Sequence, residues 1–158
     1  GVAEMTYTHY NRIALRAELS FDEGRRNRMY LDSEGIATIG VGWNLRDNIL
    51  PEDVIDRLAD EGIEQAEEAL DKIEPGWRNI DKVNPNRQRA LLNMAFNMGH
   101  LRLAAFKRMW AAIHNAIQTG DESWWEEAAK HALDSKWAAQ VGKRAERIAT
   151  VLRTGVPA

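Results

Sequence analysis

Most of this chain has the 3.6-residue spacing of apolar positions that is typical of helices, and one short stretch near its start does not. A helix is predicted from Asn11 to Glu23, where apolar and charged residues mix without glycine or proline, and Gly24 is expected to end it. Similar patterns predict later helices at 52–73, from Asn84 onward, and at 103–119, 123–133, 135–140 and 143–153. The pattern therefore indicates a mainly α-helical chain with a small β-containing part near its start.

The exception lies at residues 28–42, where apolar and polar residues alternate with the period of two that is typical of strands. Ser33-Glu34-Gly35 fits a three-residue hairpin loop with its glycine in the left-handed conformation. In that register Tyr30 lies opposite Thr38, and Asp32 shares a face with Thr38 as a diagonal neighbour about 7–8 Å away. A bulge at the loop glycine would change this register.

After the hairpin, residues 43–48 predict a third short strand that runs into a loop, and Pro51 suits the first position of a long helix. That helix, 52–73, has one narrow apolar stripe and is otherwise polar, so we expect it to connect two lobes. An ordinary surface helix is the alternative. Gly62 interrupts it at a cost of about 1 kcal/mol relative to alanine, which leaves room for a bend. The next helix is apolar on almost every side and is predicted to be the buried centre of the larger lobe.

The hairpin and the helix before it carry the candidate chemistry. Glu23 ends the first helix, where unpaired carbonyls carry partial negative charge and favour a protonated carboxyl. A protonated carboxyl can act as a general acid. Asp32 and Thr38 place a carboxylate and a hydroxyl on one face of the hairpin. Taken alone, Glu23 fits an ordinary exposed carboxylate near a helix end better than it fits a catalytic acid.

The spacing of these residues resembles the active-site signature of a known family. Glu, eight residues, Asp, five residues and Thr occur in order within DEGRRNRMYLDSEGIATIGVG, which is similar to the phage-type lysozymes, the muramidases of glycoside hydrolase family 24. Residues 93–99 resemble the central-helix motif of that family, and residues 135–155 resemble its C-terminal helices. The similar segments follow one another from about Leu19 onward.

This resemblance implies an α+β, mainly α-helical lysozyme-like fold in a single catalytic domain, 1–158. The small N-terminal lobe, about 12–60, holds a β-hairpin or three-stranded sheet. A long helix, 51–74, connects it to a larger all-helical lobe, 75–158, on which the first helix is expected to pack.

The resemblance also implies the roles of individual residues. Glu23 protonates the glycosidic oxygen, while Asp32 and Thr38 handle the water or the developing positive charge. Arg144 matches a family arginine that pairs with the catalytic glutamate; the alternative is a surface residue of a basic helix. Substrate contacts are implied at Asn44, Phe96 and His131. His131 fits a solvated helix residue equally well.

Two neighbouring residues depart from the family pattern. Trp43 stands where several relatives carry histidine, and Asn44 stands where an apolar cleft residue is common. Trp43 either provides apolar packing where the histidine of those relatives gives a polar contact, or stacks on a sugar ring of the substrate. The departures concern substrate fit and the response to pH rather than the reaction.

The implied function is a peptidoglycan hydrolase that cleaves the β-1,4 bond between N-acetylmuramic acid and N-acetylglucosamine with inversion. Such an endolysin is a monomer that serves host lysis by a bacteriophage and has antimicrobial action. It is made in the host cytoplasm and reaches the wall after release across the inner membrane. The alternative is a catalytically silent glycan-binding or virion structural domain on the same fold, and the complete Glu-Asp-Thr set argues against it.

Composition narrows the chemistry further. The 158 residues fit one domain and include no cysteine, which excludes a disulfide framework and a cysteine nucleophile. The four histidines lack metal-ligand spacing, so neither a metal nor another cofactor is expected. No stretch reaches the length of a membrane span, and the first residues do not resemble a signal peptide, so we expect no stable membrane insertion.

Charge is distributed unevenly along the chain. The net charge is −3, but residues 51–75 carry ten acidic and two basic residues, which leaves 19 basic and 14 acidic residues elsewhere. The basic excess outside residues 51–75 favours association of the chain with anionic peptidoglycan. An acidic helix with an ordinary surface elsewhere is the alternative. The basic residues of the C-terminal helices are interleaved with acidic ones, so a nucleic-acid partner is not expected.

Overall fold

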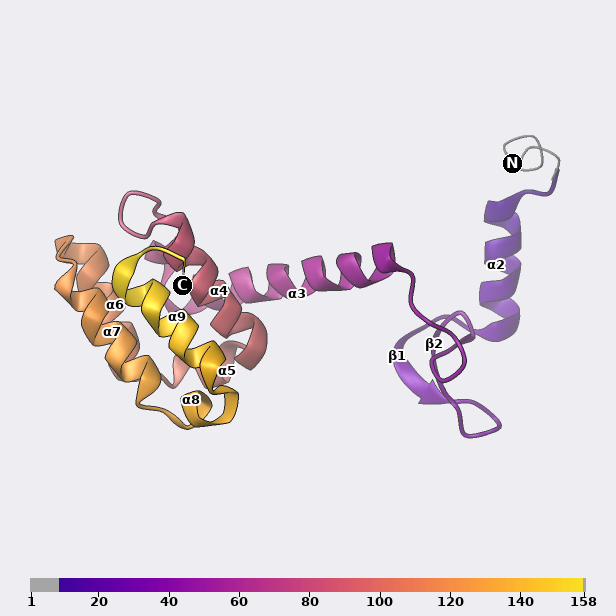
Figure 1. Ribbon diagram of the computed structural model, residues 1–158. Coiled ribbons are helices and arrows are strands. Elements are labelled where there is room, and N and C mark those ends of the chain that lie inside the picture. The colour runs from indigo at the N-terminus through magenta and orange to yellow at the C-terminus, as the bar shows by residue number, and fades with distance from the viewer. Residues whose placement is uncertain (1–8, 158) are drawn as a thin grey trace. The chain divides into compact units, whose positions relative to one another are not determined.

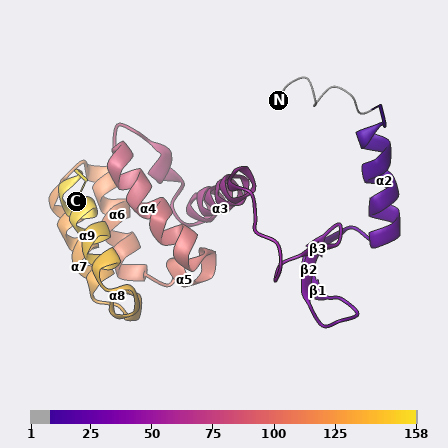
Figure 2. The same ribbon diagram turned by 45° about the vertical axis from the view of Figure 1, so that its right-hand side comes forward.

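The computed structural model describes residues 9–157, and the chain divides between Val54 and Ile55 into two compact units (Figures 1 and 2). These residues form eight α-helices and one three-stranded antiparallel sheet. The sheet belongs to the first unit, and the second unit is helical. The predicted α+β, mainly helical lysozyme-like fold is thereby confirmed.

The first unit begins with helix α2, Arg12–Glu23. The side chain of Asn11 caps its start by accepting the backbone N–H of Ala14 at 3.0 Å. Gly24 ends it with a φ of 83° and a ψ of 156°, so the chain leaves the helix in an extended conformation rather than in a left-handed helical one. No residue of α2 is buried, although the helix carries several apolar side chains.

The sheet follows in the order β1-β2-β3, with strands Arg26–Leu31, Ala37–Gly40 and Trp43–Asn44. The predicted register of the hairpin is confirmed, because Tyr30 lies opposite Thr38. Its three-residue loop is closed by the backbone N–H of Asp32, which donates to the carbonyl of Ile36 at 3.0 Å.

The loop glycine has the expected positive φ, 77° at Gly35. The pairing of β1 with β2 is irregular between Arg26 and Tyr30, at the far end of the hairpin, and not at the loop glycine. The face that carries Asp32 therefore keeps its predicted place in the register.

Helix α3, Glu52–Ile73, starts just before the boundary between the units and has the predicted ends. Gly62 does not break it. The ring of Phe96 occupies the space where a side chain at position 62 would lie, since a Cβ built there would be 3.0 Å from the Phe96 Cζ. Ala66, Ala69 and Leu70 are buried in the core of the second unit.

After the 3₁₀ turn η1, Pro75–Arg78, the second unit is built from six α-helices. They are α4 (Pro85–Met98), α5 (His100–Ala104), α6 (Lys107–Thr119), α7 (Ser123–Leu133), α8 (Lys136–Val141) and α9 (Lys143–Thr154). Helix α9 packs against both α4 and α7, and α7 also packs against α6 (Figure 1). Leu91 and Met94 of α4 are fully buried, which fits the predicted central helix, whereas Phe96 is half exposed.

Two details of the helical prediction are wrong. The predicted helix 103–119 is two helices, because Ala105 and Phe106 separate α5 from α6. The indole N–H of Trp110 donates to the carbonyl of Leu103 at 2.9 Å and satisfies it at this break. Residues 123–126 have the sequence pattern of a capping box, but Ser123 does not form one, since its hydroxyl and its backbone N–H both donate to the carboxylate of Asp121, at 2.8 and 2.9 Å.

Tryptophans gather in the core of the second unit. Four are buried there: Trp77, Trp110, Trp125 and Trp137. The helical spacing of Trp110 and Trp137 predicts core positions, and both are buried. The indole N–H of Trp137 donates to the side chain of Asn97 at 2.7 Å. Trp43 is the only tryptophan before the boundary between the units.

Candidate active site

Glu23 is the last residue of α2, and its side chain is exposed. The turn between β2 and β3 lies against it: a Cβ built on Gly42 would be 3.3 Å from the Glu23 Oε2 and 3.5 Å from its Cβ. Within residues 9–157 the carboxyl of Glu23 makes no hydrogen bond. A side chain at position 42 would therefore crowd this carboxyl.

Asp32 lies at the start of the hairpin loop and is half-buried. Its Oδ1 accepts two backbone N–H groups, from Glu34 at 2.8 Å and from Ile36 at 2.9 Å. Two such bonds to one oxygen fix the plane of the carboxylate. Its Oδ2 makes no hydrogen bond to the described part of the chain and can accept one from a ligand.

Thr38 is only 3% exposed, in the middle of the sheet. Its hydroxyl donates to the carbonyl of Ile36 at 2.8 Å. The hydroxyl oxygen can then only accept a further hydrogen bond. Asp32 and Thr38 are thus tied to the same residue, one through the N–H of Ile36 and the other through its carbonyl.

Asn44 shapes the loop after β3 with both ends of its amide. The Oδ1 accepts the backbone N–H of Arg46 at 2.8 Å and that of Asp47 at 3.0 Å, and the Nδ2 donates to the Asp47 Oδ2 at 2.9 Å. Arg46 pairs with Asp47 at 3.0 Å, and this hydrogen bond lowers the pKa of Asp47. A substrate contact at Asn44 stays a prediction, and it would compete with these bonds. Trp43 beside it is 38% exposed, enough to offer part of its ring to a ligand.

Phe96 and His131 belong to the second unit. Phe96 is half exposed and lines a cavity of about 460 Å³ between α3 and the end of α4. His131 lies on α7, with its Nε2 3.6 Å from the carboxylate of Glu127, and lines an open cavity of about 540 Å³ beside the start of α6. Both positions are accessible to a ligand, and their predicted role in substrate binding stays a prediction.

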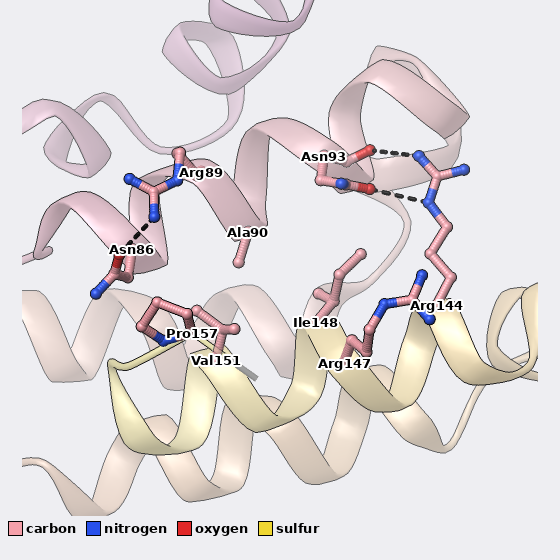
Figure 3. A pocket seen from close by; sticks show the side chains of 9 residues that line it. All are labelled: Asn86, Arg89, Ala90, Asn93, Arg144, Arg147, Ile148, Val151 and Pro157. Carbon is pink, nitrogen blue, oxygen red and sulfur yellow. Dashed lines mark hydrogen bonds between the residues drawn. The ribbon is translucent and has the colours of Figure 1, made fainter.

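Arg144 lies in a groove of about 300 Å³ between α4 and α9 (Figure 3). Its Nε donates to the Asn93 side chain at 2.9 Å, and its Nη2 donates to the Asn93 carbonyl at 3.4 Å. Arg89 and Arg147 line the same groove, and no carboxylate does. The predicted partner Glu23 belongs to the other unit, so the pair of Arg144 with Glu23 stays a prediction.

The three predicted catalytic residues, Glu23, Asp32 and Thr38, all belong to the first unit. Sequence analysis did not identify Gly42, the residue that touches Glu23. The Gly-Val-Gly sequence after the hairpin is the signal that could have found it.

Across residues 9–157, no three His, Asp or Glu side chains gather into a group that could hold a metal ion, and no helix is both long and apolar enough to cross a membrane.

Comparison with known proteins identifies the family of the chain. The phage lysozyme family model matches residues 21–151, which include the helix end, the hairpin and all of the helical unit up to α9. The chain belongs to the phage lysozyme family. It is a glycoside hydrolase of the lysozyme class, and the family supports a muramidase-like action on peptidoglycan.

The chain is similar to two probable T4-type lysozymes and to a pre-baseplate central spike protein. The chain is 30% identical to the probable T4-type lysozyme 2 of Dictyostelium discoideum, over 90% of this chain and 95% of the relative. Identity to the probable T4-type lysozyme 1 of the same organism is 25% over the same shares of both chains. The chain is also 33% identical to the pre-baseplate central spike protein Gp5 of Enterobacteria phage T4, over 85% of this chain but only 26% of the spike protein.

Proposed function

We propose that this chain cleaves the β-1,4 bond between N-acetylmuramic acid and N-acetylglucosamine in peptidoglycan glycan strands, with inversion at the anomeric carbon. Glu23 is the general acid, and Asp32 is the general base. The arrangement that carries this proposal is a carboxyl held by packing at a helix end, combined with a carboxylate whose plane is fixed by its hairpin loop.

In the proposed reaction the Glu23 carboxyl donates its proton to the glycosidic oxygen as the bond from that oxygen to the anomeric carbon breaks. Positive charge develops on the sugar ring, and a water attacks the anomeric carbon from the opposite face. The free Oδ2 of Asp32 accepts a proton from that water. The cycle ends when Asp32 loses this proton to solvent and Glu23 regains one.

Thr38 has a supporting place in this scheme. Because its proton is committed to the carbonyl of Ile36, its oxygen can accept a hydrogen bond from the attacking water but cannot donate one. An inverting reaction further requires the two carboxyls to lie about 6.5–9.5 Å apart, with the water between them.

The products of purified peptidoglycan test this proposal. We expect new reducing ends on N-acetylmuramic acid and, in NMR spectra taken at early times, the α-anomer. Glu23→Gln keeps the size of the side chain and removes the proton donor, so its rate should fall by about 10²- to 10⁴-fold. Glu18→Gln is the matched control on the same helix and should leave the rate unchanged. Normal hydrolysis by a folded Glu23→Gln variant would contradict the assignment.

The match to a spike protein favours a second candidate, a virion domain that binds glycan without cleaving it. Such a domain would bind purified sacculi and release no reducing ends. We favour the enzyme, acting in phage-mediated lysis as a monomer made in the host cytoplasm and released to the wall, because the complete Glu-Asp-Thr set is present. Clearing of Gram-negative cells with permeabilised outer membranes would distinguish lysis from binding.

A further inference from the structure

The turn between β2 and β3 touches the side chain of Glu23 along its length. A Cβ built on Gly42 would lie 3.3 Å from the Glu23 Oε2, 3.5 Å from its Cβ and 3.6 Å from its Cδ. A carbon within 3.3 Å of an oxygen is closer than ordinary van der Waals contact, so Glu23 would have to move by a few tenths of an ångström to admit a side chain at position 42.

This contact is separate from the backbone requirement for glycine in turns. Four glycines of the first unit have positive φ, namely Gly24, Gly35, Gly40 and Gly42. A Cβ on any of the first three would meet nothing within 4 Å. Only at Gly42 does the missing side chain leave room for a candidate catalytic group.

The same turn also faces α2 one residue earlier. Val41 lines a groove of about 290 Å³ together with Leu15 and Leu19 of that helix. Both residues of the turn therefore lie beside α2, and Gly42 is the one that lies near Glu23.

We infer that Gly42 is a positioning residue for Glu23, an inference that rests on the proposed function. Its lack of a side chain leaves free the space beside the Glu23 carboxyl, and no hydrogen bond within residues 9–157 would hold that carboxyl in place against a side chain at position 42. Proton transfer to a glycosidic oxygen depends on placement of the acid, and a misplacement of about 1 Å is enough to cost roughly 10²-fold in rate.

The test compares Gly42→Ala with Gly40→Ala, which has similar backbone strain, at a φ of 68° against 63°, but no contact with Glu23. On soluble glycan strands we expect kcat of Gly42→Ala to fall about 10- to 100-fold with KM within about twofold of the parent. Gly40→Ala should keep kcat within about threefold. The pH profile of kcat should change in Gly42→Ala alone, because the added methyl group alters the surroundings of the acid.

A third variant separates contact from strain. Gly42→Asn tolerates positive φ better than alanine but still carries a Cβ, so it should lose kcat as Gly42→Ala does. It also provides the measurement if Gly42→Ala fails to fold, as judged by circular dichroism. Position 42 variants whose kcat, KM and pH profile match those of Gly40→Ala would overturn the inference. In that case Glu23→Gln would still be inactive, whereas failure of the proposed function would leave Glu23→Gln active.

Discussion

The Oδ1 of Asp32 accepts the backbone N–H of Ile36 at 2.9 Å, across the hairpin loop. The same oxygen accepts the N–H of Glu34 at 2.8 Å. One carboxylate therefore has two tasks, since Oδ1 holds the loop and Oδ2 is left for chemistry. A variant that keeps the oxygen but removes the charge can separate them.

Asp32→Asn should retain the loop and lose activity. Its amide oxygen can still accept both N–H groups, while the general base is gone, so we expect the rate of reducing-end release to fall by 10²-fold or more. Asp32→Ala should lose both functions, with about 1–2 kcal/mol less local stability. Amide hydrogen exchange at Ile36 is the measurement: it should be faster in Asp32→Ala and nearly unchanged in Asp32→Asn. Equal rates of amide exchange at Ile36 in the two variants would show that the Asp32 side chain does not stabilise the loop.

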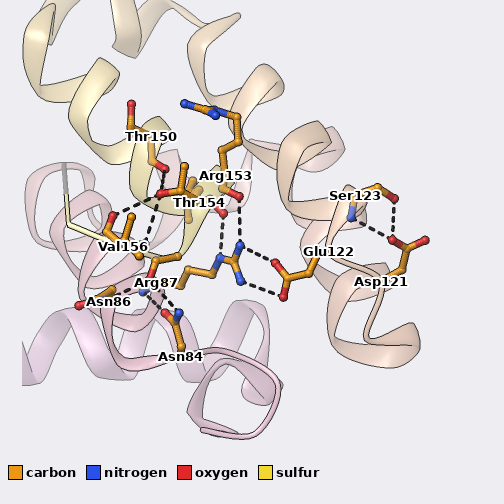
Figure 4. A network of polar contacts seen from close by, with 12 residues as sticks. Asn84, Asn86, Arg87, Asp121, Glu122, Ser123, Thr150, Arg153, Thr154 and Val156 are labelled. Carbon is orange, nitrogen blue, oxygen red and sulfur yellow. Dashed lines mark hydrogen bonds and ion pairs between the residues drawn. The ribbon is translucent and has the colours of Figure 1, made fainter.

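Arg87 is buried where α4, α7 and α9 meet, and it should dominate the stability of the helical unit (Figure 4). Its guanidinium donates to the carbonyl of Leu152 at 2.8 Å, binds Glu122 at 2.8 Å and lies 4.6 Å from the ring centroid of Trp125. Arg87→Ala leaves a buried carbonyl unpaired and removes the cation from the ring, so we expect a loss of about 2–4 kcal/mol in urea unfolding.

Two control variants accompany this measurement. Arg89→Ala removes an exposed arginine from the same helix and should change stability by less than about 0.5 kcal/mol. Glu122→Gln should cost less than about 1 kcal/mol, because the Glu122 side chain is 75% exposed and Arg87 keeps its backbone carbonyls. A large loss in Glu122→Gln would mean that the ion pair dominates.

Gly62 and Phe96 should be coupled. Alanine normally stabilises an exposed helix by about 1 kcal/mol relative to glycine. In α3 the added methyl group would meet the Phe96 ring, so Gly62→Ala should be neutral or destabilising in the parent chain. In a Phe96→Ala background the same substitution should recover a gain of about 1 kcal/mol. A double-mutant cycle from urea unfolding gives the coupling energy, and simple additivity would contradict the contact.

Asp71 should contribute to stability only above acidic pH. Hydrogen bonds from Arg78 and from the indole of Trp77 lower the pKa of Asp71 below its ordinary value of 3.8. A carboxylate whose pKa is lower in the folded state stabilises the fold above its unfolded pKa, and that contribution disappears as the pH falls through the folded pKa.

The unfolding free energy of Asp71→Asn should therefore lie below that of the parent at pH 6, and the difference should shrink below pH of about 4. Asp71 and Arg78 are both exposed to screening solvent, so we expect the difference at pH 6 to be no more than about 1 kcal/mol. Asp60→Asn, an exposed carboxylate on the same helix, is the matched control and should show no such trend.

Local signals in the sequence were sufficient for much of the fold. The uninterrupted pattern of residues 11–23, the loop around Gly35 and the periodicity of residues 52–73 predicted α2, the hairpin register and α3. Each of these features depends on neighbours within a few residues, which a sequence displays directly.

What the sequence could not supply depends on contacts between distant residues. The break before α6 is stabilised by the indole of Trp110, seven residues from the carbonyl that it binds. Burial of Arg87 depends on the end of α9, about 65 residues away, and charge alone predicts an exposed side chain. The candidate site was predicted through its spacing, but Gly42 was missed: the Gly-Val-Gly sequence marks a turn, and the nearness of that turn to Glu23 depends on the fold.

The distribution of tryptophans decides which unfolding a fluorimeter detects. Five of the six belong to the helical unit, and Trp43 alone reports on the unit that holds Glu23, Asp32 and Thr38. Intrinsic emission could therefore remain native while the unit that holds the candidate catalytic residues is already unfolded. An inhibitor or stabiliser screen that follows this signal would select compounds that stabilise the helical unit. Replacing the other five tryptophans would leave Trp43 as the only fluorophore of this kind and would make the screen report on the first unit.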